Sequence, residues 1–319
     1  RALVGLGVGD DCVRTGFAYR RTLVLGRNGQ PLVAMEVDRL AGERFPGALG
    51  MARADLQRVL ARAAESAGAR FEWNAQALAV HLGRGPACIE FAGGRQAVAD
   101  LVLLACGARA GLRASVFGAA PPAASGQAWL DLLVARPARL GEALQAGGPA
   151  GFKAHVLPLG ATLAGLRLTG PAGAQAELVL ATESVPQVLR TFPPQIAALL
   201  PVGDATARPA VREAVAGTLP LHWHRGPVLA VGGCAHDFSP QFGQHAAQAM
   251  EDALVLGELL AASNDPAAIG PAFERRRAAR VLPLMAITDR AARWESTPDA
   301  ATDLQALHSE LGRLVAQAA

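Results

Sequence analysis

An apolar run, a glycine pair, a loop and a long helical pattern follow one another between residues 228 and 262, and they constrain the fold more than any other stretch. The run 228–231 is typical of a buried strand in a parallel sheet. A helix is predicted over Gln244–Ala262, and its pattern places on one face Ala247, Met250, Leu254, Gly257 and Ala261. Between them, the glycines at 232–233 and the loop 234–243 turn the chain back. The N–H groups at the start of such a helix carry about half a positive charge. The segment therefore predicts a site for an anionic ring edge or a phosphate.

Two earlier segments have the same alternation of strand and helix. Asp100–Ala105 reads as a second buried strand of the parallel type, and it runs directly into Cys106 and Gly107. Upstream, the pattern that begins at Arg53 places its apolar residues on one face of a helix, which Gly68 ends. These segments predict an α/β fold for this part of the chain.

A different pattern covers residues 121–221, where short alternating segments are separated by Gly and Pro. Two such segments are 163–168 and 176–181, and one helical stretch is predicted near 185–200. Because alternation is typical of an antiparallel sheet with one exposed face, the region predicts a second domain of α+β character. Asn28-Gly29, between two apolar runs, predicts a hairpin with a type I′ turn. Three more short strands are predicted at 71–73, 77–82 and 88–91.

Length, charge and hydropathy exclude several classes of protein. A chain of 319 residues, 51% of them hydrophobic and 18% charged, has room for two domains and is neither disordered nor a coiled coil. A net charge of +3 is too small for a nucleic-acid-binding surface, and the arginines within 275–280 are interpreted as a solvated helix face with ion pairs. No run approaches the roughly 18 apolar residues of a membrane span, although peripheral contact with a membrane stays open.

The cysteines and histidines suggest two minor alternatives. The four cysteines form no C-x-x-C pattern, so neither a zinc site nor a disulfide framework is expected, and a reducing cytoplasm is favoured. Cys106 and Cys234 both fall at predicted strand ends, where a redox pair is an alternative to two small buried residues. Histidines at 222, 224, 236 and 245 invite a metal hypothesis, but no carboxylate or cysteine completes a ligand spacing, so no metal is expected.

The segment 232–253 resembles the second flavin-contacting motif of the class A flavoprotein monooxygenases, the family of para-hydroxybenzoate hydroxylase and the ubiquinone-pathway hydroxylases. That motif reads G-D-A-A-H-P-x-x-P-x-x-G-Q-G-x-x-x-x-x-E-D-A, and the chain aligns to it without a gap. The matching residues are Gly232, Ala235, His236, Pro240, Gly243, Gln244, Glu251, Asp252 and Ala253. Two other blocks agree in order: 53–56 resembles the family's R-x-x-L helix start, and 99–113 resembles its A-D-L-x-x-x-A-D-G-x-x-S-x-x-R strand and loop.

The resemblance implies an FAD-dependent monooxygenase that is reduced by NAD(P)H and uses O₂ to hydroxylate an aromatic or quinone-precursor ring. It assigns the cofactor contacts to Arg53, Cys106, Gly107, Gly232, Gly233, Pro240, Gly243, Gln244 and His245. Among these, Arg53 would lie near the ribityl and phosphate groups, and 240–245 would lie beside the isoalloxazine ring. No side chain is predicted to be the catalytic acid, base or nucleophile. A small aromatic or apolar substrate is expected under a largely aliphatic sheet that carries Trp129, Phe152, Val156 and Leu157.

The chain departs from the family at two acidic positions. Gly233 stands where the family has an Asp that accepts hydrogen bonds from the ribityl chain, and Cys106 replaces the Asp of the A-D-G block. Each lost charge-assisted hydrogen bond costs about 1.5 to 3 kcal/mol. The family's G-x-G-x-x-G fingerprint would precede the region that matches Arg1, and the glycines at 5–9 are interpreted as a helix tail and turn instead.

The predicted organisation is therefore an incomplete Rossmann-like FAD-binding domain, which lacks its first βαβ unit, together with an antiparallel-sheet substrate domain. The FAD-binding domain is predicted at 1–15, 50–120 and 222–262, the substrate domain at 16–49 and 121–221, and C-terminal helices at 263–319. The alternative is a degenerate, non-catalytic flavin-fold protein or gene fragment that acts as a binding module. Loss of both acidic residues favours that alternative, and retention of Pro240, Gly243 and Gln244 opposes it.

Overall fold

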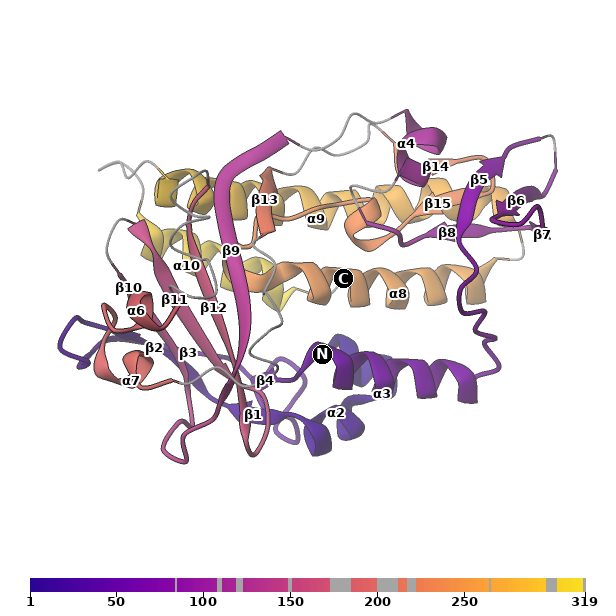
Figure 1. Ribbon diagram of the computed structural model, residues 1–319. Helices are drawn as coiled ribbons and strands as arrows, with labels where there is room; N and C mark the ends of the chain where they lie inside the picture. Colours follow the sequence, from indigo (N-terminus) through magenta and orange to yellow (C-terminus); the bar gives the residue numbers. More distant parts are fainter. Residues whose placement is uncertain are drawn as a thin grey trace. The chain divides into compact units, whose positions relative to one another are not determined.

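The computed structural model describes residues 1–83, 85–107, 111–118, 123–148, 151–172, 185–199, 212–216, 222–263, 265–296 and 303–317 (Figure 1). The chain divides by packing into two compact units. The first contains Leu3–Arg70 and Gly126–Ala214, and the second contains Phe71–Ser125 and Val215–Ala319. This division groups 50–70 with the first unit, whereas the predicted functional division assigns 50–70 to flavin binding. The segment predicted at 176–181 lies outside the described residues.

A seven-stranded sheet forms most of the first unit (Figure 1), in the order β13-β9-β12-β11-β10-β2-β3. Neighbouring strands from β9 to β10 and from β2 to β3 run antiparallel, while β10 and β2 run parallel. The bounds are β2 Arg21–Leu25, β3 Pro31–Glu36, β9 Ala123–Ala135, β10 Ala143–Gly147, β11 Lys153–Pro158, β12 Leu163–Pro171 and β13 Arg212–Ala216. The predicted half-exposed antiparallel sheet is therefore confirmed for the strands described, because β11 and β12 alternate buried and half-buried residues along their length.

One face of this sheet is the core of the first unit. Val156, Leu166 and Leu168 are fully or almost fully buried there, together with residues of α6 (Val185–Leu189) and α7 (Pro194–Ala197). The sequence predicted one helical stretch at 185–200, and the structure has two short helices because Pro193 interrupts the backbone hydrogen bonding between them.

The hairpin predicted at Asn28-Gly29 is present between β2 and β3, but its turn is not of type I′. Only Gly29 has a positive φ, of 80°, and the Gly29 N–H donates to the Gly26 carbonyl. The connection is thus a longer loop with one left-handed glycine, and the strand register shifts at Leu25. An Asn-Gly pair permits a two-residue turn without requiring one.

Short elements precede and follow this hairpin in the first unit. They are α1 Ala2–Gly5, α2 Gly9–Thr15, β1 Phe17–Tyr19, β4 Ala48–Gly50 and α3 Arg53–Ser66. Gly7, between α1 and α2, has a φ of 75°, so the predicted helix tail and turn at 5–9 are confirmed. Gly68 ends the α3 segment with a φ of 94°, as its position after the apolar pattern predicted.

Among its described residues, the second unit contains two small sheets and four α-helices; Figure 1 labels them. Their bounds are β5 Ala77–His81, β6 Ala87–Phe91, β7 Gln96–Ala99, β8 Val102–Leu104, α4 Gly111–Phe117, β14 His224–Arg225, β15 Val228–Ala230, α8 Gln244–Ala262, α9 Pro266–Ser296 and α10 Leu304–Ala316. One sheet has the order β14-β15-β8 and the other β5-β6-β7. The core contains Trp223, Leu229, Phe238, Phe273 and Leu284, all buried. Within the described residues, no helix is long and apolar enough to cross a bilayer.

Two local predictions for this unit were wrong. Residues 71–73 are not a strand; Phe71 and Trp73 instead stack their rings at 5.4 Å in an exposed turn. The bounds of α8 agree with the prediction, but its buried face does not, because the sequence pattern placed Ala247, Met250 and Leu254 inward. The residues that are buried include Gln248, Glu251 and Asp252. The spacing of apolar residues could not predict this face of α8, because its buried charges are neutralised by arginines of another helix, α9.

Candidate functional site

The site begins where two parallel strands of the second unit end. β8 and β15 pair in parallel, and beyond the last ladder pair the Val231 N–H donates to the Leu104 carbonyl at 3.0 Å. The chain then continues as Cys106-Gly107 after β8 and as a 3₁₀ turn, Gly232–Cys234, after β15. A β-carbon built on Gly233 would lie 3.9 Å from the Gly107 Cα. The two glycine-bearing strand ends therefore lie against each other.

The start of α8 is open to a ligand's negative charge. Its N-cap is Gly243, which has a φ of 63° and supplies no side-chain acceptor, and the first turn carries no acidic residue. Phe242, just before it, also has a positive φ, of 65°. Since the first N–H groups of a helix have no intrahelical partner, they leave a partial positive charge at this end.

The predicted loop residues differ in how much of each remains available to a ligand. Pro240 is half-buried, while Gly243 and His245 are exposed. The Gln244 side chain donates to the Phe242 carbonyl at 3.2 Å, and its oxygen accepts from Gln248 Nε2 at 3.4 Å. His245 Nε2 lies 3.2 Å from an Asp237 carboxylate oxygen. Both side chains are thus already engaged within the unit, which leaves the backbone N–H groups of this turn to face a ligand.

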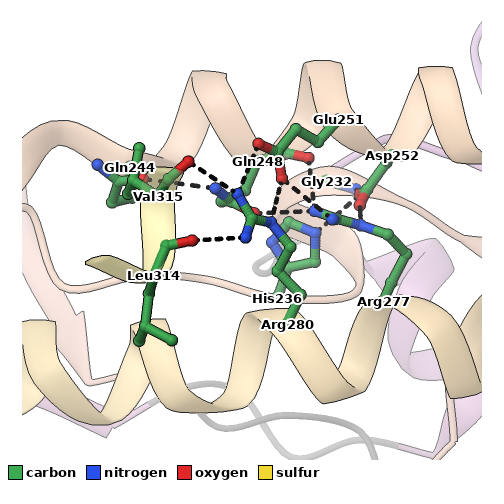
Figure 2. Close-up of polar contacts among 10 residues, drawn as sticks. All are labelled: Gly232, His236, Gln244, Gln248, Glu251, Asp252, Arg277, Arg280, Leu314 and Val315. Atoms are coloured by element: carbon green, nitrogen blue, oxygen red, sulfur yellow. Dashed lines mark hydrogen bonds and ion pairs between the residues drawn. The ribbon is translucent and has the colours of Figure 1, made fainter. Parts of the chain in front are cut away.

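A buried ionic network fixes the glycine strand end to α8 (Figure 2). One carboxylate oxygen of Asp252 accepts from the Gly232 N–H at 2.7 Å and from His236 Nε2 at 2.8 Å, and the other accepts from Arg277 Nε at 2.6 Å. Asp252 is 1% exposed and Arg277 is 0% exposed. The His-to-Asp pairing of the sequence motif is therefore buried and bonded to the backbone of the glycine strand end.

The same network continues along α8 through Glu251 and Gln248. Figure 2 shows Arg280 donating to both Glu251 oxygens, from Nε at 2.7 Å and from Nη2 at 3.0 Å. Arg280 Nη1 also donates to the Leu314 carbonyl at 2.7 Å, and so ties α10 to the cluster. Arg277 donates to the Gln248 carbonyl at 3.1 Å and to its side-chain oxygen at 2.9 Å. Three helices are thus joined around two arginines.

The network holds both of its carboxylates in the charged form. Burial alone would raise the pKa of Asp252, but the hydrogen bond and charge of His236, with Arg277 and the Gly232 N–H, outweigh burial and lower that pKa. Glu251 behaves in the same way: burial opposes ionisation, while Arg280 and then Arg277 lower its pKa overall.

The arginines were the functional side chains that sequence reasoning misjudged. The prediction for 275–280 was a solvated helix face with ion pairs, and the ion pairs are present, but Arg277 is fully buried and Arg280 nearly so. Arg276 fits the prediction, since it pairs with Glu258 at the surface, and Arg275 is exposed as well. The signal that could have found the network is two arginines three residues apart, on one face of a predicted helix, in a chain whose motif contains an adjacent Glu-Asp pair.

Of the nine predicted cofactor contacts, eight lie in the second unit and Arg53 lies in the first. Arg53 is exposed and is the first residue of α3, a helix whose N-cap, Ala52, supplies no side-chain acceptor. Its charge and the helix start are both suited to a phosphate. The assignment of Arg53 to the cofactor stays a prediction.

The sheet of the first unit carries polar side chains on the face opposite its core. Cross-strand partners place His155 opposite Arg167, and Arg167 opposite Asp131. Arg167 donates to both Asp131 oxygens, at 2.7 and 2.8 Å, and its guanidinium lies 5.5 Å from the centre of the Trp129 ring. Burial, with a smaller contribution from the charge of Arg167, lowers the pKa of His155 to about 4, so this imidazole is neutral at pH 7.

Two of the four substrate-facing residues predicted for this sheet lie in its core instead. Phe152 and Val156 are 3% and 0% exposed within the core, so they cannot line a binding face. Leu157 lies on the opposite, half-buried side, because alternate residues of a strand point to opposite faces. Trp129 is also half-buried, and its ring lies beside Arg167. The exposed face is consequently more polar than the aliphatic roof that was expected.

The predicted histidines serve local contacts. His224 Nδ1 lies 2.7 Å from one Glu274 oxygen, and His222 Nδ1 lies 3.5 Å from the other. In the part of the chain that the structure describes, no cluster of three or more metal-ligating side chains is found.

Comparison with known proteins supports a flavoprotein fold. No model of a known protein family matches the chain. One curated relative is the putative FAD-dependent monooxygenase YetM of Bacillus subtilis (strain 168), which is 43% identical over 60 residues. That match covers 19% of this chain and 16% of the relative, so it spans only a small part of either protein.

Solved structures match almost the whole chain. HpxO of Klebsiella pneumoniae, complexed with FAD and uric acid, has a TM-score of 0.76 and 21% identity, over 98% of this chain and 81% of that one. PqsL of P. aeruginosa, in complex with 2-aminobenzoylacetate, has a TM-score of 0.74 and 17% identity, over 99% of this chain and 86% of that one. A variant of 2-methyl-3-hydroxypyridine-5-carboxylic acid oxygenase has a TM-score of 0.69 and 21% identity, over 97% and 82%. The resemblance drawn from the sequence is therefore confirmed, and the chain has the fold of the FAD-dependent monooxygenases.

Proposed function

We propose that the protein is an FAD-dependent monooxygenase that uses NAD(P)H and O₂ to hydroxylate a small aromatic ring. The observation that carries the proposal is the meeting of two glycine strand ends, at Gly107 and Gly233, in the unit that also carries the open start of α8. Bound flavin would supply the electron transfer and the reaction with O₂. The protein would supply position, charge and exclusion of water.

The residues present fit a flat and partly anionic ring. A β-carbon on Gly107 would meet no atom of the described residues within 4 Å, and its φ of 84° strongly favours glycine. Gly233 likewise presents bare backbone. The first N–H groups of α8 would stabilise negative charge on the ring's pyrimidine edge. Gly232 would act differently: its N–H is already bonded to Asp252, so its role is to set the position of the strand end.

The phosphate contact is assigned to the first unit. Arg53 is an exposed cation at the start of α3, where helix charge and side-chain charge both favour an anion. We assign it to the phosphate nearest the ribityl chain, as the resemblance implies. In this proposal Arg53 contributes to binding of FMN and FAD but not to binding of riboflavin, which has no phosphate.

The substrate is assigned to the polar face of the seven-stranded sheet. The Trp129 indole nitrogen is buried and has no hydrogen-bond partner among the described residues, and the Arg167 guanidinium lies beside the same ring. Neutral His155 adds a second donor or acceptor there. These groups suit a small aromatic ring that carries an acidic or carbonyl oxygen. Uric acid, 2-aminobenzoylacetate and a hydroxypyridine carboxylic acid, named with the structural neighbours, have this chemistry.

The reductant and the compartment complete the proposal. NAD(P)H is proposed because the resembling family uses it, and a reducing cytoplasm is proposed because all four cysteines are free thiols. The alternative, a non-catalytic binding module, is not favoured by neighbours that are themselves oxygenases.

Flavin titration tests the proposal. Riboflavin, FMN and FAD are titrated into the purified chain, and the dissociation constants are measured by quenching of flavin fluorescence. We expect saturable binding of all three, with Arg53→Ala weakening FMN and FAD only. FAD should bind this chain little more tightly than FMN, because the G-x-G-x-x-G fingerprint expected to hold the adenosine half of FAD is not among its residues. The titration is repeated on the gene product with any residues encoded upstream of Arg1.

The same titration can be made on a variant that restores the carboxylate of the family motif. Gly233→Asp returns the acidic residue of the family motif, and a β-carbon there meets nothing closer than 3.9 Å. One charge-assisted hydrogen bond of about 1.5 to 3 kcal/mol corresponds to about ten- to a hundredfold tighter flavin binding. Gly233→Ala is the matched control and should not tighten binding. The proposal fails if flavin binds to none of the three proteins: the wild type, Gly233→Asp and the longer gene product.

A further inference from the structure

We propose that Cys106 and Cys234 are a peroxide-sensitive thiol pair that oxidises to an intramolecular disulfide. This site goes beyond the proposed function and does not depend on flavin binding. The two sulfurs lie 3.7 Å apart, although the residues are separated by 128 positions in the chain. Both are free thiols in the structure.

The placement of the pair follows from the parallel pairing of β8 and β15. Cys106 lies two residues beyond the end of β8, and Cys234 closes the 3₁₀ turn that follows β15. A disulfide requires sulfurs about 2.05 Å apart, so the pair must close by about 1.7 Å. Gly107 and Gly233 adjoin the two cysteines, and this glycine backbone can absorb a small adjustment. The bond would tie together the two strand ends that are proposed to face the flavin.

Accessibility sets the order of the two chemical steps. Cys106 is exposed to solvent, whereas Cys234 is fully buried, so a dissolved oxidant reaches Cys106 first. Burial, followed by the nearby Cys106, raises the pKa of the Cys234 thiol to about 12, and Arg113 opposes that rise. Cys234 therefore stays protonated while Cys106 reacts.

Hydrogen peroxide is the oxidant in this proposal. In the first step the Cys106 sulfur attacks a peroxide oxygen; the O–O bond breaks, an S–O bond forms, and the departing hydroxide takes the thiol proton to give water. In the second step the Cys234 sulfur attacks the Cys106 sulfur; the S–O bond breaks, the S–S bond forms, and the hydroxyl leaves as water with the Cys234 proton. The two thiols lose two electrons and two protons in total, and one peroxide is reduced to two waters.

Peptide mapping tests the pair directly in the wild-type chain. Trypsin separates the two cysteines into peptides 96–109 and 226–275, and it places Cys12 and Cys88 in two others. After treatment with stoichiometric H₂O₂ and alkylation of the remaining thiols, we expect loss of two of the four thiols and a linked 96–109/226–275 peptide that dithiothreitol separates. The variant Cys12→Ser/Cys88→Ser should lose the same two thiols.

Trapping of the intermediate with dimedone adds a second readout. Cys234→Ala should accumulate a dimedone-reactive sulfenic acid at Cys106, whereas the wild type should not, because Cys234 resolves it. The proposal is overturned if the wild type yields no linked peptide, if the linked peptides join two different chains, or if Cys106 is labelled equally with and without Cys234. The linked peptide is sought in the wild-type chain, so its absence cannot be explained by misfolding of a variant.

Discussion

Replacement of Arg277 by Met should destabilise the second unit strongly, because this single side chain compensates two buried carboxylates. Met has a similar length and no charge, so the substitution removes the bonds to Asp252, Glu251 and Gln248 without leaving a large void. Asp252 would keep His236 and the Gly232 N–H, but it would lose its bond to Arg277, at 2.6 Å. Glu251 would keep Arg280.

The expected magnitude follows from burial. Removal of one partner of a buried ion pair costs about 3 to 5 kcal/mol, because the remaining charge is left uncompensated. Arg276 offers a matched control on the same helix: it pairs with Glu258 at 2.6 Å, but the two side chains are 39% and 60% exposed. Exposed pairs contribute about 0.2 to 1 kcal/mol. The two arginines are adjacent in sequence, so their helix context is nearly the same.

Equilibrium unfolding in urea, followed by far-UV circular dichroism and tryptophan fluorescence, measures the difference. Trp223 is buried, its ring lies 5.5 Å from His236, and it therefore reports on the second unit. A double variant, Arg277→Met/Asp252→Asn, should lose less free energy of unfolding than the sum of the two single losses, since each change relieves the charge that the other exposes. If the free energies of unfolding of Arg277→Met and Arg276→Met differ by less than about 1 kcal/mol, the stabilising role of the buried network is refuted.

Three further predictions concern pH, the strand-end glycine and the sheet face. Because the network lowers the pKa values of Asp252 and Glu251, the stabilisation it provides is complete above their ordinary values of 3.8 and 4.5 and is lost as the pH falls through the lowered values. Urea midpoints measured from pH 7 to pH 2.5 should show this loss, and in Arg277→Met the urea midpoint should depend less on pH. Gly232→Ala should destabilise the protein by about 1 to 2 kcal/mol, because φ is +55° and the new β-carbon would lie 3.2 Å from the Ala249 β-carbon. Gly257→Ala should instead stabilise α8, because its β-carbon would meet no described atom within 4 Å, and chemical denaturation of both variants measures the difference. The His155 imidazole should titrate near pH 4 in a histidine NMR titration of the wild type and at higher pH in Arg167→Gln. Because folding lowers its pKa, the contribution of His155 to stability is lost as the pH falls from 6.5 to 4. Titration near 6.5 in the folded wild type would contradict the burial assigned to this side chain.

The sequence predicted the elements that alternate strongly or follow a helical period. The bounds of α8 agreed with the prediction because Gly243 precedes it and a regular pattern fills it, and β12 agreed because its residues alternate without a break. Phe71 and Trp73 were misjudged because three aromatic or polar residues look like a strand when no partner strand is known. Pairing is a tertiary property, and local propensity does not determine it.

The parts of the site that the sequence could not predict all depend on long-range charge. The glycine, proline and helix-start residues of the loop were found because each has a local backbone role. Burial of Arg277 could not be read from the four arginines within 275–280 alone, since a buried arginine and an exposed one have the same local pattern. The same limit explains why the polar face of the sheet was expected to be aliphatic: His155 and Arg167 become neighbours only through the register of β11 with β12.

The dissociation constant of FAD for the wild-type chain and for Gly233→Asp tests the central claim most directly. We expect saturable binding of FAD to the wild type, binding about ten- to a hundredfold tighter to Gly233→Asp, and no tightening in Gly233→Ala. The absence of saturable FAD binding to either protein, together with no binding to the product that carries any upstream residues, would contradict a flavin site at the ends of β8 and β15.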